Sequence, residues 1–435
     1  MSRVFYGWWI VLACWAVTLY GGGAFFFGFS AFFKPISEEF GWSRALTAGA
    51  ISLSQAEGFI EGPIVGPLVD RFGPRKLMLV GICMVTIGFL ALSMVNTLVF
   101  FYLVSVVFLA IGFNTGFFVA SQAAVANWFI KRRSRALGLL STANGFGGAI
   151  MAPVVAGLIL RFGWRVASVW LGLGMFVIGI PLAFIVRHRP EQYGYLPDGE
   201  KARDDSSNTV DSTGESKGET QGQVSRTGEV DFTIWEALAT RVFWMLAVAF
   251  GLRTLAISAT VIHQIPFLTD RGFSEPAAAG ILAMMGLMSI PGRLIFGFLG
   301  DYFNKRYLLV IAYLLQALGI YILLTADSIQ QVLLFTVVFG MGWGAPNLLF
   351  ALRADYFGRK YFATIAGVEQ SIVAIGTVIG PVYAGLVYDI NQSYQLAYST
   401  FIVSIALGSV ICFFAYPPKP PKRLRQSQDE AQASA

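Results

Sequence analysis

Long apolar stretches separated by short polar segments run along the whole chain. Each has about 18 residues or more, enough for a helix to cross a hydrocarbon core of ~30 Å. They lie near 7–29, 45–69, 77–95, 98–127, 136–160 and 165–186 in the first half, and near 242–268, 278–299, 307–326, 329–352, 363–387 and 394–415 in the second. No strand pattern competes with them, so the pattern predicts an all-α membrane protein with twelve transmembrane helices.

Three short motifs recur in the two halves at nearly the same spacing. The matching pairs are 152–158 with 380–386, 70–72 with 301–303, and 112–113 with 342–343, at offsets of 228, 231 and 230 residues. Long internal repeats in an apolar chain are typical of secondary transporters, whose substrate site lies between the repeats near the bilayer midplane. The sequence therefore predicts two pseudo-symmetric six-helix halves with a site between them.

The composition agrees with a chain that lies mostly in lipid. Hydrophobic residues make up 56% of the chain and charged residues 13%, whereas about a quarter of a soluble protein is charged. Within each half, the loops after the even-numbered spans hold twelve Lys and Arg residues, and the alternate loops hold five. This asymmetry places the first set of loops and both termini in the cytoplasm, and we expect a multi-pass protein of the cell inner membrane. The net charge of +6 follows from this topology, so no nucleic-acid partner is expected.

The segment between the halves has a different composition. Residues 200–231 contain no aromatic residue and are rich in Ser, Thr, Gly and charged residues. Such a segment cannot bury enough apolar surface to offset its ordering entropy, so we expect a disordered linker followed by a short amphipathic helix at 231–238. The expected organisation is an N-terminal half at 1–187, a cytoplasmic linker at 188–240, a C-terminal half at 241–416 and a cytoplasmic tail at 417–435.

Residues suited to metal binding or nucleophilic catalysis are scarce. Cys14, Cys83 and Cys412 fall in separate predicted spans, which favours buried packing over a disulfide framework or a metal site. Only two histidines occur, and the chain has no nucleotide-binding motif and no nucleophile–base arrangement. We therefore expect no metal, no cofactor and no enzymatic activity, with transport driven by an ion gradient or by exchange.

The loop after the second span carries Gly66, Asp70, Arg71, Gly73 and Arg75. This run resembles the cytoplasmic signature of the major facilitator superfamily, which combines a small-residue packing face with an Asp and cations that bind a neighbouring helix terminus. Further runs resemble the bacterial monocarboxylate transporter and oxalate/formate antiporter branch, at 6–9, 32–35, 39–44, 128–133, 162–165, 235–238 and 243–244. The resemblance covers almost the whole chain except the linker and the tail. It implies the major facilitator fold, and we expect a monomer.

Arg293 is the sharpest candidate for a binding residue, because it lies in an otherwise uncharged apolar run. A cation at the bilayer midplane costs ~2.5–3.5 kcal/mol on insertion scales, so such residues usually face a cavity or a partner. A guanidinium matches a carboxylate with two parallel hydrogen bonds. The resemblance implies that an Arg at this place binds the substrate carboxylate; the alternative is a structural pair with an acidic residue of another helix.

His263 lies in the seventh span, thirty residues before Arg293. The resemblance implies that this helix lines the central cavity and that some bacterial relatives have a His near the bound carboxylate. A His there can donate a hydrogen bond to the anion or carry the coupled proton. The alternative is a polar residue that hydrogen-bonds only within the bundle.

Glycines beside an aromatic residue and an amide interrupt the fourth and tenth spans at equivalent places. Asn114 lies in the run 112–116, and Trp343 and Asn347 lie in the run 342–347. This pattern is expected where helices yield to a ligand, so we predict substrate contacts from these three residues. Helix packing through glycine, with each amide satisfied by a neighbouring group, is the alternative.

Two acidic residues, Glu57 and Glu61, lie one turn apart in the second span and share a helix face. Intramembrane carboxyl groups can carry protons, so both are coupling candidates beside His263. The alternative is that these carboxylates belong to a gate ion pair or to a satisfied polar cluster. Arg253 and Glu369, in the seventh and eleventh spans, could have the same structural role.

The chain departs from the animal monocarboxylate carriers at two positions. By our alignment, their helix-1 lysine falls on Phe27 and their helix-8 aspartate on Ser289. The oxalate/formate exchanger has a lysine on helix 11, where this chain has Val373 and no Lys or Arg between 361 and 389. Proton coupling is therefore absent or rebuilt elsewhere, and a dianion would leave one carboxylate without a cation.

The sequence as a whole predicts a carrier for a small organic monoanion, such as a short 2-oxo or 2-hydroxy acid of the lactate or pyruvate type. It would work by alternating access, as a proton symporter or an exchanger. The alternatives are a dicarboxylate or other organic-anion exchanger and a multidrug efflux carrier, whose cationic or neutral substrates a lone cavity Arg disfavours. A non-transporting membrane sensor is a remote alternative.

Overall fold

The computed structural model describes residues 5–42, 46, 53–54, 57–199 and 230–421, and these residues form helices and connecting segments without a strand. The elements of the first half are α1 (Tyr6–Gly22), η1 (Gly23–Phe27), α2 (Phe29–Phe40), α4 (Gly58–Phe72), α5 (Pro74–Leu92), α6 (Leu98–Leu103), η2 (Val104–Ala110), α7 (Ile111–Phe113), η3 (Asn114–Val119), α8 (Ala120–Trp128) and α9 (Arg133–Ile185). The short 3-10 segments η4 (Pro190–Tyr193) and η5 (Pro197–Gly199) follow. The second half has α10 (Ile234–Leu238), α11 (Arg241–Asp270), α12 (Glu275–Leu299), α13 (Lys305–Leu324), α14 (Ile329–Trp343), α15 (Pro346–Phe357), α16 (Phe362–Asn391) and α17 (Gln395–Phe414).

Ten helices within the described ranges are long and apolar enough to cross a membrane. One of them, α9, is two predicted spans joined at Gly163, whose φ of 78° and ψ of 159° break the helix direction. The predicted second span is described mainly from Gly58 onward, as α4. The predicted all-α architecture, with long apolar helices that can cross a membrane, is confirmed for the described residues.

The first helix continues past its predicted end at residue 29. A π-helical segment, η1, is followed by α2, which ends at Phe40. Lys34 and Glu38 of this extension are exposed and lie within 3.8 Å of one another. Polar residues of α2 are thus in contact with solvent, which is why an apolar stretch did not reveal the full length of the helix.

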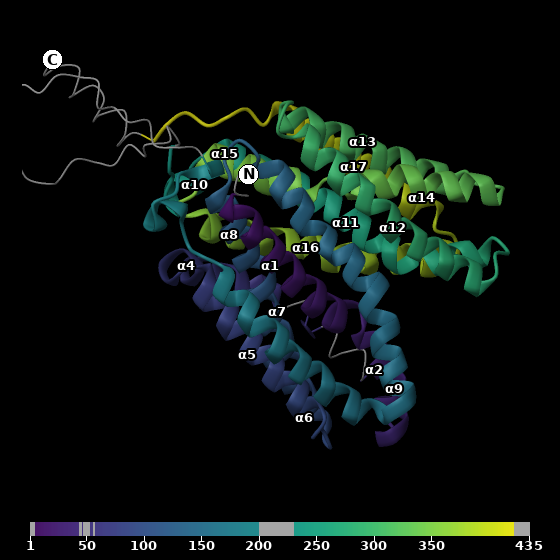
Figure 1. Cartoon of the computed structure of the whole chain (residues 1–435). Coiled ribbons are helices and arrows are strands. Elements are labelled where there is room, and N and C mark those ends of the chain that lie inside the picture. The colour runs from purple at the N-terminus through teal and green to yellow at the C-terminus, as the bar shows by residue number, and fades with distance from the viewer. Residues whose placement is uncertain (1–4, 43–45, 47–52, 55–56, 200–229, 422–435) are drawn as a thin grey trace, which may run out of the picture.

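Two hydrophobic cores lie in the two halves. One is built almost entirely from residues of the first half, together with a few from α15 and α16, and the other from α10 to α17. In Figure 1 the bundle of α1, α5 and α9 and the bundle of α12, α13 and α17 meet at one end and diverge toward the other. The start of α1 and the end of α17 both lie where the bundles meet, and we call this the terminal end.

At the terminal end, carboxylates from each half bind a helix N-terminus of the other half. Asp70 accepts hydrogen bonds from the backbone N–H groups of Ala363 (3.1 Å) and Thr364 (2.7 Å), where α16 begins. Asp301 accepts from the backbone N–H groups of Ser134 (3.0 Å) and Arg135 (3.2 Å), where α9 begins. Free N–H groups and the positive end of a helix dipole favour an anion, so each contact stabilises the junction of the halves. Burial raises the pKa of the Asp301 carboxyl, although the amide donors act in the opposite direction.

The other signature residues support this junction indirectly. Gly66 lies against the backbone of Ala363 and leaves no space for a side chain, and Gly73 has a φ of 87°. Both guanidinium groups lie over aromatic rings. The guanidinium carbon of Arg71 is 5.4 Å from the ring centre of Phe72, and that of Arg75 is 4.6 Å from the ring centre of Phe184. The aspartate of the signature therefore binds a helix terminus as the resemblance implies, whereas its cations contact aromatic rings.

Both ends of the predicted linker are bound to the body of the protein. Asp198 accepts hydrogen bonds from the backbone N–H groups of residues 130–132, and Asp231 accepts from those of Arg359 and Lys360. The expectation of disorder is therefore wrong for Asp231, because its carboxylate occupies a loop of free N–H groups. The predicted amphipathic helix is present as α10, with a capping box between Thr233 and Glu236. Residues 200–229 lie outside the described ranges.

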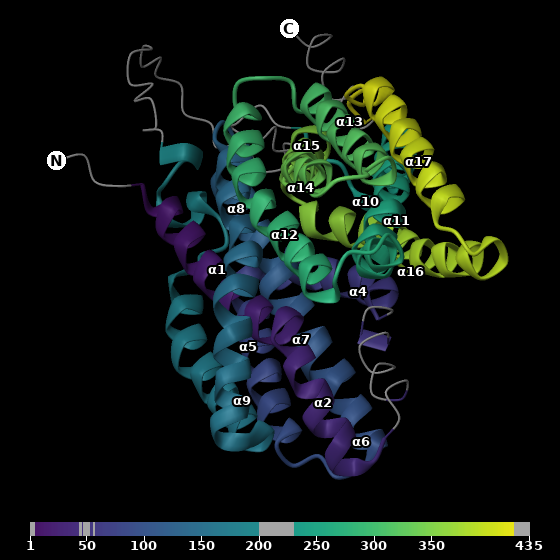
Figure 2. The ribbon, with the colours of Figure 1, turned by 90° about the vertical axis from the view of Figure 1, so that its right-hand side faces the viewer.

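The helices that join the halves approach with backbone against backbone. Figure 2 shows α16 beside α4 at the junction, where Gly62 lies against the backbone of Gly367. A second contact pairs α9 with α12, where Gly138 lies against Gly297. Small residues at such contacts allow the close approach that van der Waals packing between helices requires.

Replacing Gly367 by Ala is expected to shift the protein away from the closed terminal end, because the new Cβ would overlap the backbone of Gly62. Positions 76 and 360 are exposed, one in each half. Spin labels at these positions would report the opening of the terminal end as a longer inter-label distance. Gly157→Ala is the matched control, since no atom lies within 4 Å of the position of its added Cβ. An unchanged distance distribution in the Gly367 variant would contradict the assigned role of this contact.

Candidate functional site

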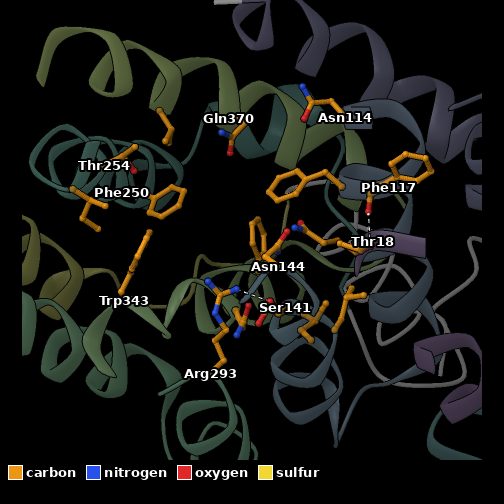
Figure 3. Close-up of a pocket in the computed structure, with 18 of the residues that line it drawn as sticks. Thr18, Asn114, Phe117, Ser141, Asn144, Phe250, Thr254, Arg293, Trp343 and Gln370 are labelled. Carbon is orange, nitrogen blue, oxygen red and sulfur yellow. Dashed lines mark hydrogen bonds between the residues drawn. The ribbon is translucent and has the colours of Figure 1, made fainter. Parts of the chain in front are cut away.

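A cavity of about 420 Å³ lies between the two halves. Its polar lining residues are Thr18, Asn114, Gln122, Ser141, Asn144, Arg253, Thr254, Arg293, Asn347 and Gln370. Its aromatic lining residues are Phe113, Phe117, Phe118, Phe250, Trp343 and Phe350. Figure 3 shows side chains of both halves facing one another across this space. A concave site with a few polar groups among aromatic residues is the usual form of a small-ligand site.

Arg293 reaches the cavity from α12. Its Nη1 donates a hydrogen bond to the backbone carbonyl of Ser141 on α9, at 2.5 Å, so the side chain spans the two halves. Its Nε is buried and has no hydrogen-bond partner among the described residues. Among the described residues, no carboxylate forms an ion pair with the Arg293 guanidinium. The alternative of a structural pair is therefore not observed, and the guanidinium keeps donors for an anion.

The interrupted helices of the sequence pattern both border this cavity. The fourth span contains two π-helical segments, η2 and η3, and the second begins at Asn114. Such segments occur frequently at functional sites. The tenth span ends at Trp343 and restarts after Gly344 and Ala345. Gly344 lies against the backbone of α12 beside Arg293, a contact that leaves no space for a Cβ.

Asn114, Trp343 and Asn347 all line the cavity, together with Arg293. Asn347 is buried and donates from Nδ2 to the carbonyl of Gly344 at 3.2 Å, which satisfies one group freed by the break in the helix. The structure thus brings together four of the five predicted substrate residues.

His263 does not lie at this cavity. Its Nε2 donates to the backbone carbonyl of Pro381 (3.0 Å) and its Nδ1 accepts from the hydroxyl of Tyr394 (3.1 Å), because a carbonyl can only accept. The cavity-lining residues of α11 are Phe250, Arg253, Thr254 and Ile257, spaced as one helix face. His263 is ten residues beyond Arg253, about 15 Å along the helix, and lies between α11, α16 and the start of α17.

The acidic residues of the second span lie beside the cavity. Glu57 accepts a hydrogen bond from Nδ2 of Asn114 at 2.5 Å, and Glu61 accepts from the hydroxyl of Thr115 at 2.9 Å. Glu61 lines a smaller chamber of about 120 Å³. This chamber shares Asn114, Phe118, Gln122, Phe350 and Gln370 with the main cavity. The two coupling candidates are therefore connected to the predicted binding site through Asn114.

Two buried arginines of the second half have different surroundings. Arg353 donates from Nε to Glu369 at 2.7 Å, and both side chains are 1% exposed. The suggestion of a structural ion pair thus fits Glu369, with Arg353 as its partner. Arg253 lines the cavity, and its guanidinium lies 5.6 Å from the ring centres of both Phe250 and Tyr313. The helical spacing of Arg253 with Phe250 and Ile257 is the sequence signal that places it on the cavity face.

Two helical halves with a cavity between them are typical of secondary transporters. The family model of the Major Facilitator Superfamily matches residues 13–351 and 265–434, so the chain belongs to this superfamily. It is a multi-pass membrane transporter and not an enzyme.

Several relatives match along most of their length. The uncharacterized MFS-type transporter YcxA of Bacillus subtilis (strain 168) is 24% identical over 93% of this chain and 94% of its own. Monocarboxylate transporter 4 of Gallus gallus is 24% identical over 95% and 85%, and monocarboxylate transporter 2 of Homo sapiens is 24% identical over 93% and 84%.

Solved structures share the fold at low identity. The human organic anion transporter MFSD10 (TETRAN) superimposes with a TM-score of 0.68 at 15% identity, over 93% of this chain and 99% of that chain. The Escherichia coli fucose:proton symporter FucP gives a TM-score of 0.65 at 16% identity, over 94% and 98%.

Replacing Arg293 by Gln is expected to leave the thermal stability of the ligand-free protein unchanged or raised, because it removes a buried charge that has no counter-ion. Replacing Glu369 by Gln leaves Arg353 buried without its partner and is expected to cost ~3–5 kcal/mol. Thermal unfolding of both variants in detergent, followed by tryptophan fluorescence, measures the difference. An equal loss of stability in the Arg293 variant would show that Arg293 has a structural role.

Proposed function

We propose that the protein is a secondary active transporter of a small organic anion that binds through a carboxylate to Arg293. The observation that carries this proposal is the guanidinium itself: it borders the central cavity and has no carboxylate partner among the described residues. A buried cation is costly unless something compensates it, and a substrate carboxylate provides the missing charge. The hydrogen bond from Nη1 of Arg293 to the carbonyl of Ser141 orients the guanidinium. The remaining N–H groups of the guanidinium are available to the ligand.

The cavity favours a small substrate with a polar group beside its carboxylate. Asn144, Asn347 and Gln370 supply amide groups, while Phe250 and Trp343 restrict the space. A short 2-oxo or 2-hydroxy acid fits this combination, and relatives named as monocarboxylate transporters support a monocarboxylate. Aromatic walls with few donors set the size of the ligand, and the donors set its orientation.

A dicarboxylate is the second candidate. Arg253 favours it, because this residue also borders the cavity and its buried Nη2 has no hydrogen-bond partner among the described residues. The Arg253 guanidinium lies over two aromatic rings, which partly compensate its charge. Val373 disfavours a dicarboxylate, because this apolar residue lines the cavity at the place of the second cation in the oxalate/formate exchanger. A multidrug efflux carrier fits less well, because two arginines at the cavity repel cationic substrates.

Transport would proceed by alternating access. The terminal end is closed by the contacts of Asp70 and Asp301, and the other end is where the bundles diverge. The distribution of Lys and Arg supports a cytoplasmic position for the terminal end. In this topology the conformation faces outward, in an inner membrane, with the monomer as the transporting unit.

Replacing Arg293 by Lys is expected to abolish most substrate binding while the protein remains folded, because an ammonium keeps the charge and loses the planar fork. Purified protein in liposomes is offered radiolabelled lactate, pyruvate, oxalate, succinate and a cationic drug. We expect uptake of carboxylates by the wild type and a loss of about tenfold or more in apparent affinity in the variant, as for a broken bidentate pair.

Arg161→Lys is the matched control, since Arg161 is exposed at the end remote from the termini. Uptake of the cationic drug alone would contradict the proposed substrate class. Wild-type affinity in the Arg293 variant would remove this residue from the site.

A further inference from the structure

Glu57 and Glu61 lie one helical turn apart, where the backbone N–H of Glu61 donates to the carbonyl of Glu57 at 3.0 Å, and both side chains contact η3 through Asn114 and Thr115. Two ionised carboxylates on the same helix face repel one another, and a site without a cation can relieve this repulsion by binding a proton. Oε2 of Glu57 is buried and has no hydrogen-bond partner among the described residues. Glu61 is 7% exposed, so the pair has little access to water that could separate the two charges. The proximity and burial of these groups therefore favour one bound proton in this conformation.

No cation lies in the surroundings of the pair within the described ranges. The chamber beside Glu61 is lined by amides, hydroxyls and apolar side chains. From η3, Asn114 and Thr115 contact the pair as neutral donors. The nearest acidic residue of α16, Glu369, is held by Arg353, and on α5 the thiol of Cys83 is exposed. A proton is thus the charge-compensating ligand that this chamber can accept.

The pair lies next to a contact that must separate during transport. Gly62, which follows Glu61, lies against the backbone of Gly367, and the chamber itself is bounded by both α4 and α16. Separating α4 from α16 admits water to the carboxyl groups, and water stabilises the ionised form far better than the closed chamber does. Proton release and opening of the terminal end therefore favour one another.

We propose that Glu57 and Glu61 share one proton that is bound while α4 and α16 are in contact and released when these helices separate. The proton enters from the open side through the cavity, protonates one carboxylate, and leaves as hydronium at the terminal end when that carboxyl ionises. Asn114 connects this site to the substrate, because its amide donates to Glu57 and also borders the main cavity. This proposal rests on the proposed transport function only for the direction of the coupled movement.

The test measures conformation without any substrate, so it is independent of which anion is carried. Full-length protein in lipid nanodiscs carries spin labels at positions 76 and 360, and the inter-label distance is recorded between about pH 5 and about pH 9. We expect the closed population to fall as the pH rises, since the closed state binds the proton more tightly. In Glu57→Gln with Glu61→Gln, whose amides cannot ionise, the closed population should stay high at every pH.

Glu38→Gln is the matched control, because Glu38 is an exposed carboxylate on α2 that pairs only with Lys34 among the described residues. This variant should keep the pH dependence of the wild type. The single variants Glu57→Gln and Glu61→Gln give a second measurement if the double variant does not fold, and each should reduce the pH response. A wild-type response in the double variant, or a wild type whose distance does not change with pH, would overturn the proposal. Failure of the anion panel with a pH response intact would refute the substrate class alone.

Discussion

The structure depends on the binding of two aspartates to helix N-termini across the junction of the halves. Asp70 binds the start of α16 and Asp301 the start of α9, and the two contacts are related by the internal repeat. Each uses backbone N–H groups that have no partner within their own helix. These contacts join the halves at the terminal end, and in this conformation α12 and α9 border a cavity beside Arg293. Water can replace the hydrogen bonds of Asp70 and Asp301 at the terminal end. The junction can therefore open without disrupting either hydrophobic core.

The buried charges support the proposal that this cavity binds the substrate. Arg353 has an acidic partner and forms part of the interior, whereas Arg293 lacks one among the described residues. In our proposal, the acidic pair of the first half has the opposite deficit, which a bound proton compensates. An organic anion and a proton would then satisfy the two sites on either side of Asn114, and movement of both together would keep the buried charge nearly constant during the transport cycle. That constancy is favourable, since uncompensated charge in a low-dielectric interior is costly.

Periodicity and repeats predicted much of this arrangement, and the failures have physical reasons. Twelve apolar stretches and a repeated motif were sufficient for the fold, and Arg293 stood out because no other charge lies near it in sequence. The sequence did not reveal that His263 lies beyond the cavity-lining residues of α11, because a helix assignment alone does not fix which residues face the cavity. Asp231 is the last residue of the segment that composition marks as disordered, and Asp198 lies just before that segment, yet both bind loops that are distant in sequence. The partner of Glu369 was equally invisible, since pairing across helices depends on packing.

The central claim is that a substrate carboxylate pairs with Arg293 in the cavity between the halves. The most direct measurement is a structure of the wild-type protein with a transported carboxylate that carries a heavy atom, located by its anomalous signal. The account predicts one signal inside the cavity, with the carboxylate oxygens within hydrogen-bond distance, about 2.7–2.9 Å, of the Arg293 guanidinium. A ligand bound elsewhere, or one whose carboxylate points away from Arg293, would contradict it.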